Sequence, residues 1–163
     1  MLHVRPATGA DLDVIVAGNM ALAEESERVR LDPVTLREGV LALLDGRAPG
    51  AYWAAELDGR VLGQLLITFE WSDWRNRMVW WIQSVYVLPE ARGQGVFRAL
   101  YATARREAEA AGAGGLRLYV DTTNTRAQAV YNALGMDGGH YRVFEDMFAT
   151  PPREQPMHPP PAK

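Results

Sequence analysis

The sequence predicts an α/β protein of the α+β type, with a mixed, mostly antiparallel central sheet and helices on both faces. Three observations support this prediction. Segments with strand-like alternation and segments with helical spacing follow one another in the order βααβββαβαβ. The dipeptide Asp58-Gly59 separates two strand segments and is typical of a two-residue hairpin, whose turn positions need positive φ. Strand–helix–strand units beside such hairpins place helices on both faces of one sheet.

The first half of the chain predicts two helices and three strands. Residues 3–5 form the first strand. Residues 8–11 have the form of a capping box, and apolar residues follow them at helical spacing. Asp32-Pro33 starts a second helix, because an N-cap residue followed by proline suits a first turn. Residues 52–57 and 61–70 are the two strands of the hairpin.

The second half predicts a longer strand, two helices and two short strands. The strand covers residues 78–87, and a helix with one apolar face follows at about 95–111, where glycines end it. Alternating apolar residues over 116–120 predict a further strand. A helix over 125–134 stops at a glycine, and residues 141–144 predict the last strand.

Composition limits the classes of function. The chain has 163 residues with 17 Lys and Arg against 20 Asp and Glu, and its net charge of −3 argues against nucleic acid as a partner. It has no cysteine, which excludes disulfides, thiolate nucleophiles and cysteine-based zinc sites. The 3 histidines are scattered, so no metal site is predicted. No apolar run approaches the ~20 residues of a membrane span and no signal peptide is recognisable, so a soluble cytoplasmic protein is expected.

The chain divides into one domain and a tail. Residues 1–149 are expected to form a single folded domain, since their length suits one hydrophobic core. Residues 150–163 include six prolines and offer little that can be buried, which predicts a flexible, extended tail. The alternative interpretation of this segment is a proline-rich ligand for a partner domain.

The glycine turn after the long strand is the sharpest local feature. The strand ends at Val87, the turn reads Arg92-Gly93-Gln94-Gly95, and a helix follows. Glycines let consecutive N–H groups converge, and the helix N-terminus adds partial positive charge. Arg92 and Arg98 add full charges, so the turn suits a phosphate or a pyrophosphate. It is neither a P-loop nor a dinucleotide fingerprint, and the alternative is a turn that only connects strand to helix.

A second constellation lies downstream of this turn. Asn124 stands just ahead of a helix, and the residues that follow it at fixed spacing are Ala127, Tyr131, Gly135 and Met136. Taken alone, Tyr131 would more often be a core tyrosine than a catalytic one. Together with the Arg92-Gly93-Gln94-Gly95-Val96 turn, however, the pattern resembles the GNAT superfamily of acyl-CoA-dependent N-acetyltransferases. The resemblance covers about residues 2–148 and does not specify a substrate.

The resemblance implies a role for each motif residue. The main chain of Val85, Tyr86 and Val87 would pair with the pantetheine arm of CoA, with an N–H near Val87 facing the thioester carbonyl. Amides of the turn would hold the pyrophosphate, and the residues concerned are Arg92, Gly93, Gln94, Gly95, Val96, Phe97 and Arg98. Asn124 would contact the pantetheine, and Tyr131 would lie beside the sulfur as a hydrogen-bond or proton donor. Phe97 departs from the family pattern, which has a small residue there.

The sequence leaves the general base and the acceptor site open. The strand segment 79–85, where some relatives carry a glutamate, has no acidic residue. The candidates elsewhere are Glu24, Glu25, Glu27, Glu70 and Asp73, and a chain of water to bulk solvent is an equal alternative. Trp71 and Trp74 with Glu70 and Asp73 would suit a cationic acceptor beside an aromatic wall, with Glu25 as a further acceptor ligand. The alternative is a tryptophan-capped hairpin packed on the sheet.

The sequence therefore predicts an N-acetyltransferase that moves the acetyl group of acetyl-CoA by direct attack to a primary amine of a small molecule or an exposed protein amine. No metal, nucleic acid or membrane is expected as a partner, and a homodimer is compatible with the sequence. The first alternative is a non-catalytic acyl-CoA-binding regulatory module, which the missing strand carboxylate favours and Tyr131 disfavours. An interaction protein acting through the proline-rich tail rests on composition alone. No serine lies in the context that a serine hydrolase needs.

Overall fold

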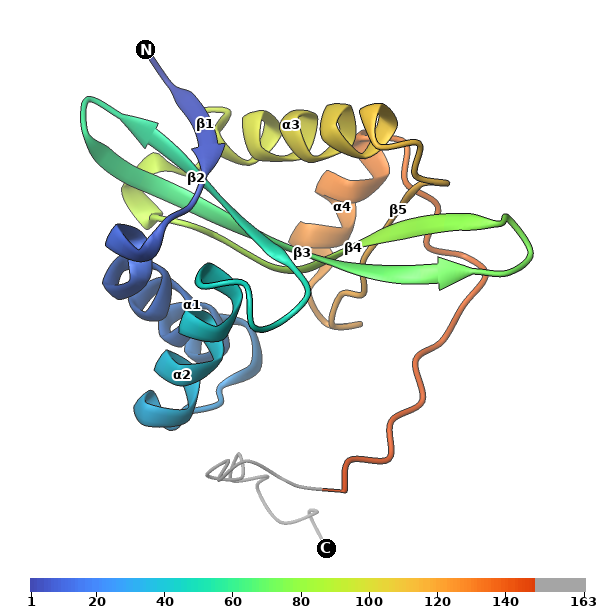
Figure 1. The fold of residues 1–163 in the computed structure, drawn as a ribbon, viewed down its shortest axis with the longest axis horizontal. Helices are drawn as coiled ribbons and strands as arrows, with labels where there is room; N and C mark the ends of the chain where they lie inside the picture. The colour runs from blue at the N-terminus through green and yellow to red at the C-terminus, as the bar shows by residue number, and fades with distance from the viewer. Residues whose placement is uncertain (149–163) are drawn as a thin grey trace, which may run out of the picture.

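The described chain forms one five-stranded sheet with helices on both faces (Figure 1). The computed structural model describes residues 1–148, so the predicted proline-rich tail at 150–163 lies outside the described residues. The strand order is β1-β2-β3-β4-β5, in which β1 to β4 pair antiparallel and β5 pairs parallel to β4. The predicted mixed, mostly antiparallel sheet is confirmed. Within residues 1–148, no helix is both long and apolar enough to cross a membrane.

The elements follow one another in the predicted order as far as the last helix. The strands are β1 (His3–Pro6), β2 (Ala51–Leu57), β3 (Arg60–Ser72), β4 (Arg77–Val87) and β5 (Leu116–Arg117). The α-helices are α1 (Leu12–Glu27), α2 (Pro33–Leu44), α3 (Val96–Ala110) and α4 (Thr125–Ala133). Two short 3-10 turns, η1 (Gly9–Asp11) and η2 (Pro89–Ala91), precede α1 and α3.

The turn and cap signals act as the sequence predicts. The Asp58-Gly59 turn has φ of 52° and 80°, and it closes the hairpin of β2 and β3. The Asp32 carboxylate accepts a hydrogen bond from the Thr35 N–H at 2.8 Å and so caps α2. Ahead of α1, the Thr8 N–H donates to the Asp11 carboxylate at 2.7 Å, which is one half of a capping box.

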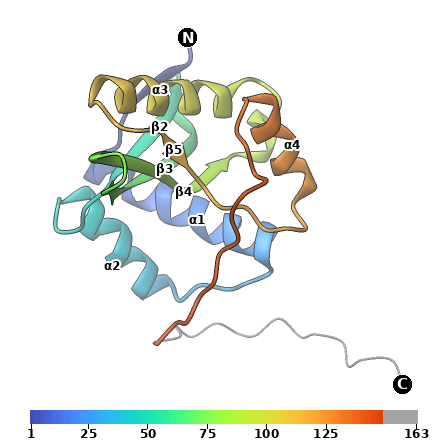
Figure 2. The same ribbon diagram turned by 90° about the vertical axis from the view of Figure 1, so that its right-hand side faces the viewer.

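Residues 62–67 of β3 are buried on both faces because helices cover both sides of this part of the sheet. Leu65 and Ile67 join a core cluster with Leu100 of α3 on one face, which we call the α3 face. Leu66 lies between them in sequence and joins Ile15 of α1 on the opposite face, which we call the α1 face. Figure 2 shows the same layers from the side, with α3 on one side of the sheet and α1 and α2 on the other.

Two predicted strands differ from the structure. The segment 116–120 forms only the two-residue β5, because β4 pairs with it only at Trp80 and Trp81. The strand predicted over 141–144 is wrong: that segment has no strand structure, and Tyr141 and Phe144 are 82% and 92% exposed. Alternation of apolar residues is not sufficient for a strand. The main chain also needs a neighbour for its hydrogen bonds, and β5 is too short to serve as one.

Arg5 joins β1 to the start of α1 and to β2. Its guanidinium donates to both carboxylate oxygens of Asp11, at 2.8 and 2.9 Å, and to Glu56 at 2.7 Å. Asp11 is only 5% exposed, and the hydrogen bond from Arg5 lowers the pKa of its carboxyl in spite of that burial. This ion pair fixes the beginning of α1 against the sheet.

Asp11→Asn should lower the free energy of unfolding by about 1–3 kcal/mol at neutral pH, because Arg5 loses a charge-assisted partner. The folded pKa of Asp11 is lowered, so its contribution is present above the unfolded pKa of about 3.9 and is lost as the pH falls through the folded pKa. Denaturant unfolding of both proteins from neutral pH to about pH 3 measures this. The difference should shrink in acid, and a difference that stays constant would contradict the assigned ion pair.

Candidate active site

β4 and β5 separate soon after they pair. β5 meets β4 only at Trp80 and Trp81. Just beyond this point the register between β3 and β4 shifts, so that Gln83 has no residue opposite it and forms a β-bulge. A bulge bends its strand and disturbs the ladder locally. Residues 83–87 of β4 therefore border an unpaired opening, the β4–β5 gap, on the side that faces away from β3.

Main-chain groups of β4 face the gap in an alternating pattern. The Leu88 N–H donates to the Leu62 carbonyl of β3 at 2.9 Å, and Tyr86 belongs to the same ladder. Successive residues in an antiparallel pair direct their main-chain groups to opposite sides. Val85 and Val87 therefore direct N–H and C=O into the gap, while Tyr86 directs its own toward β3. Of the three residues predicted to pair with the pantetheine arm, Val85 and Val87 thus have main-chain groups that face the gap, and Tyr86 does not.

The glycine turn lies at the end of β4 and begins α3. Gly93 and Gly95 have φ of 77° and 84°, and a Cβ added at either position would meet no atom within 4 Å. Backbone conformation, not crowding, requires glycine here, and the space beside the turn is open. The first helical amides, from Val96 to Arg98, have no carbonyl partner within the helix. The turn offers these N–H groups and the positive end of the α3 dipole to an anion.

Arg92 connects the turn to β4 and to α1. Its Nε donates to the Val87 carbonyl at 3.0 Å, and its Nη2 donates to Glu25 at 2.6 Å. The guanidinium carbon lies 5.5 Å from the centre of the Tyr86 ring. The Tyr86 hydroxyl donates to Glu25 at 3.1 Å, and burial, followed by the Glu25 carboxylate, raises the pKa of Tyr86. Glu25, a candidate base and acceptor ligand, is therefore engaged with the glycine turn.

Tyr131 projects from α4 toward the start of α3. Its ring meets Phe97 edge to face at 5.9 Å, and Phe97 lies 6.1 Å from Tyr101. Phe97 thus packs between α3 and α4, and only its amide belongs to the turn. Burial raises the pKa of Tyr131, so its hydroxyl stays protonated near neutral pH and can donate a hydrogen bond. The Asn124 Oδ1 accepts from the Ala127 N–H at 3.0 Å and caps α4.

A polar and aromatic cluster lies beside the gap on the α1 face. The Trp81 Nε1 donates to one oxygen of Glu70, and the Arg117 Nη1 donates to the other at 2.8 Å. The Tyr119 ring lies 6.1 Å from Trp81, and the Tyr119 hydroxyl lies 3.5 Å from the Gln83 Oε1. Sequence reasoning missed Arg117, Tyr119 and Gln83 as site residues. No local signal could have identified them, because their contacts depend on how β5 pairs with β4.

The structure does not bring together the aromatic and acidic residues that the sequence predicted as an acceptor site. Trp71 follows Glu70 in β3 and so points to the opposite face, where it is 56% exposed. Trp74 lies in the hairpin turn and is 90% exposed, and the Asp73 carboxylate accepts from its N–H. Glu70 alone among these four residues lies beside the gap, and Arg117 already balances its charge.

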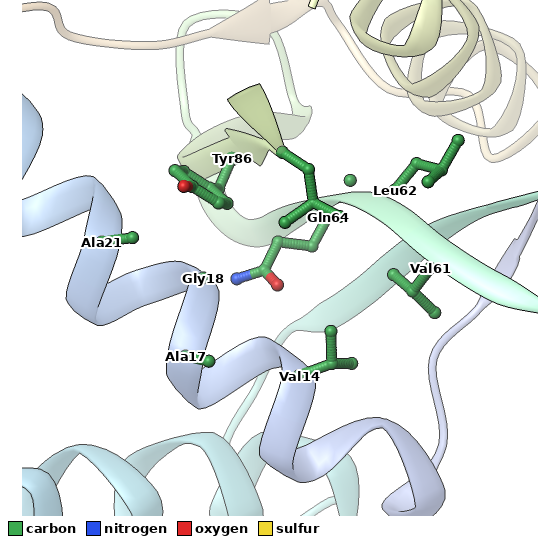
Figure 3. A pocket seen from close by; sticks show the side chains of 10 residues that line it. Val14, Ala17, Gly18, Ala21, Val61, Leu62, Gln64 and Tyr86 are labelled. Carbon is green, nitrogen blue, oxygen red and sulfur yellow. The ribbon is translucent and has the colours of Figure 1, made fainter. Parts of the chain in front are cut away.

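A separate cavity of about 220 Å³ lies between α1 and the first half of β3 (Figure 3). Gln64 is 2% exposed, and its Nε2 donates to the Ile15 carbonyl at 3.0 Å and to the Asn19 Oδ1 at 2.9 Å. A Cβ on Gly18 would lie 2.7 Å from the Gln64 side chain, so glycine permits this close approach. The lining is mainly apolar, with Tyr86 as its titratable member. This cavity lies on the β3 side of β4, not in the gap.

Comparisons with known proteins identify the family. Residues 20–136 match the acetyltransferase (GNAT) family. The chain is 37% identical over 91 residues to a thialysine N-epsilon-acetyltransferase of Bos taurus, which covers 52% of this chain and 53% of the relative. It is 37% identical over 90 residues to a mycothiol acetyltransferase of Streptomyces avermitilis, which covers 53% of this chain and 27% of that protein. The match thus spans about half of the first curated relative and about a quarter of the second.

Solved structures extend the likeness to almost the whole chain. A possible acetyltransferase from Clostridium difficile 630 is 37% identical with a TM-score of 0.84, covering 92% of this chain and 99% of that one. An aminoglycoside N-acetyltransferase in complex with CoA shares the fold at 19% identity, with a TM-score of 0.76 over 91% of this chain and 96% of that one. The chain belongs to the acetyltransferase (GNAT) family, as its two motifs predict.

Phe97→Ala should lower the free energy of unfolding by about 1–3 kcal/mol, less than the ~3–5 kcal/mol of a fully buried phenylalanine, because the ring is half-buried. Tyr131 then loses the ring against which it packs. Denaturant unfolding measures the loss. The matched control is Phe144→Ala, which removes a ring that is 92% exposed and should change little. Equal stability of the two variants would contradict the packing role of Phe97.

Proposed function

We propose that this protein is an N-acetyltransferase that transfers the acetyl group of acetyl-CoA to a primary amine. One observation carries the proposal: the open main-chain edge of Val85 and Val87 ends at the glycine turn that begins α3. CoA combines an amide-containing arm, which can hydrogen-bond along such an edge, with a pyrophosphate that suits the turn. The bovine relative is named as an N-epsilon-acetyltransferase, which supports an amine as acceptor.

The β4–β5 gap is open at the glycine turn and closed at Trp81, and these two ends determine how CoA would lie in it. Its pyrophosphate would bind the amides between Gly93 and Arg98, and its pantetheine would extend along β4 toward the closed end of the gap at Trp81. The sequence predicted an N–H near Val87 opposite the thioester carbonyl. Val87 lies at the turn end, however, and its carbonyl already accepts from Arg92. We therefore assign the thioester end to the amides of Val85 and Gln83.

The chemistry requires a neutral amine, a stabilised oxyanion and a leaving thiol. One main-chain N–H at the closed end of the gap would donate to the oxyanion, and such a donor contributes about 3 kcal/mol. Positioning of both reactants contributes up to about 7–11 kcal/mol. Tyr131 would donate a hydrogen bond or a proton to the departing sulfur, since its raised pKa keeps the hydroxyl protonated. Asn124, at the start of α4, would contact the pantetheine.

We propose that the proton of the attacking amine leaves to bulk water. β4 carries no Asp or Glu, and Glu25 and Glu70 are each paired with an arginine. Glu24 and Glu27 are exposed at the last turn of α1. Within residues 1–148, no group of three or more potential ligands is arranged to hold a metal ion, and the proposed reaction requires none.

A non-catalytic acyl-CoA-binding regulatory module is the second candidate. The lack of an acidic residue on β4 favours it, because no side chain there can take a proton. The half-buried Tyr131 and the enzymatic names of the relatives favour catalysis. A cytoplasmic location, a homodimer and a flexible tail stay predictions from the sequence.

Gly95→Glu should abolish acetyl-CoA binding, because a carboxylate would stand where the pyrophosphate binds. Gly46→Glu is the matched control, since Gly46 also has positive φ, at 77°, and open space around its Cβ position. The measurement is the melting temperature with and without acetyl-CoA, which rises when a ligand binds only the folded state. Parent and control should show the shift and Gly95→Glu should not. If Gly95→Glu binds like the parent, the pyrophosphate assignment is wrong.

Tyr131→Phe should lower kcat and kcat/KM together by roughly 10- to 1,000-fold, because the lost hydroxyl acts only as negative charge develops on sulfur. The dissociation constant of acetyl-CoA should stay nearly unchanged. Tyr101→Phe is the control: Tyr101 is buried beside the same Phe97 ring and should keep its kcat. Steady-state thiol release and unfolding of both variants provide the comparison. A Tyr131→Phe variant that is destabilised but fully active would contradict the catalytic role and show that Tyr131 serves only the packing of the core.

A further inference from the structure

The two faces of the β4–β5 gap differ in what covers them. On the α3 face, side chains from both sides of the gap pack into the core cluster; they include Val85, Val87, Leu118 and Leu134. On the other face, α1 and α2 pack against β2 and parts of β3 and β4, and the hairpin end of β3 and β4 extends past them (Figure 1). Gln83 and Tyr119 are exposed there. The α1 face is therefore the side from which an acceptor could approach the gap.

Glu70 and Arg117 form an ion pair on this face. Their charged groups lie 2.8 Å apart, and the two side chains are 42% and 31% exposed. Trp81, on the strand between them, holds the second oxygen of Glu70. The guanidinium carbon of Arg117 lies 5.9 Å from the centre of the Tyr141 ring. Both charges are thus held in position and accessible beside the gap.

A fixed pair of opposite charges suits a ligand that carries both charges. A ligand that is only cationic gains little net attraction, because Arg117 balances Glu70. A zwitterion can pair with both groups. Its carboxylate accepts from the other N–H donors of Arg117, and its ammonium donates to the remaining lone pairs of Glu70. The head group of an α-amino acid has this arrangement of charges.

We propose that the Glu70–Arg117 pair binds the α-ammonium and α-carboxylate of an amino acid whose side-chain amine is the acetyl acceptor. The inference rests on the proposed function and names its acceptor class. From Trp81, which contacts the pair, to Gln83 at the gap is two strand residues, or about 7 Å. A side chain of lysine length spans this distance, so the head group binds at the pair while the terminal amine reaches the thioester.

The transfer step needs only the amine, the thioester, Tyr131 and water. The neutral side-chain amine attacks the thioester carbon, so a C–N bond forms and the C–S bond breaks. The nitrogen loses one proton to water, and the sulfur leaves as a thiol with the proton of Tyr131, which water restores. The α-amino group is held as an ammonium by Glu70 and has no free electron pair. The product should therefore carry the acetyl group on the side-chain nitrogen.

The test compares three acceptors that share one reacting amine: lysine, lysinamide, which lacks the carboxylate, and cadaverine, which lacks the whole head group. With acetyl-CoA, kcat/KM for lysine should exceed that for the other two by roughly 10- to 100-fold, the range for a lost charge-assisted hydrogen bond. Arg117→Gln should remove this preference through KM: kcat/KM for lysine should fall, and kcat/KM for cadaverine should rise, because Glu70 then has no cation to balance it. Arg117→Lys should restore part of it. Mass spectrometry of the product should locate the acetyl group on the side-chain nitrogen.

Controls separate this role from a purely structural ion pair. Arg105→Gln removes an arginine of a similar exposed pair, Arg105–Glu109 on α3, and should keep the preference for lysine. Equal use of lysine and cadaverine by the parent protein would overturn the proposal. So would an Arg117→Gln variant that loses stability and turnover with all three acceptors alike, because the ion pair would then serve the fold only.

Calorimetry distinguishes failure of this inference from failure of the proposed function. Binding of lysine and cadaverine to the complex with CoA is measured in the parent and in Arg117→Gln, without any turnover. Preferential binding of lysine that Arg117→Gln removes, without thiol release from any amine, would support the subsite and contradict the transferase. Thiol release with aminoglycosides or peptide amines, without binding of lysine, would support the transferase and overturn the subsite.

Discussion

β4 separates from β5 after Trp81, and this separation creates the open strand edge of the candidate site. Buried main-chain groups require partners, and a strand inside a sheet normally finds them on both sides. The bulge at Gln83 lies at the point of separation, so β4 stays bonded to β3 while its other edge opens. Arg92 satisfies the Val87 carbonyl at one end of this edge. The rest of the edge is left for water or for a ligand that carries amides.

Local chemistry predicted the parts of the fold that depend on a few neighbouring residues. The Asp58-Gly59 turn needs only two positive φ values, and the Asp32 cap needs only its own helix. The glycine turn before α3 was likewise recognisable, because Gly93 and Gly95 allow a backbone that other residues disfavour. The same motif, joined to the spacing around Tyr131, predicted the family that the comparisons then identified.

Features that depend on distant pairing could not be predicted in this way. The segment 141–144 is rich in residues that favour strands but has no neighbouring edge to pair with. Arg117 contacts Glu70 across 47 positions in the sequence, and only the pairing of β5 with β4 brings them together. The failed acceptor wall differs in kind, because strand alternation already places Glu70 and Trp71 on opposite faces. The closeness of tryptophans and acidic residues in the sequence suggested an aromatic wall for the acceptor. The strand places Glu70 and Trp71 on opposite faces, so they do not form it.

Amide hydrogen exchange along β4, followed by NMR in the free protein and in the complex with CoA, shows whether β4 has an open edge that binds the cofactor. Ser84 and Tyr86, which bond to β3, should have slowly exchanging amides in both states. The amides of Val85 and Val87 should exchange fast in the free protein and become protected when CoA binds. Amides of Val85 and Val87 that are already slow without ligand, or that stay fast in the complex, would contradict an open edge that binds the cofactor.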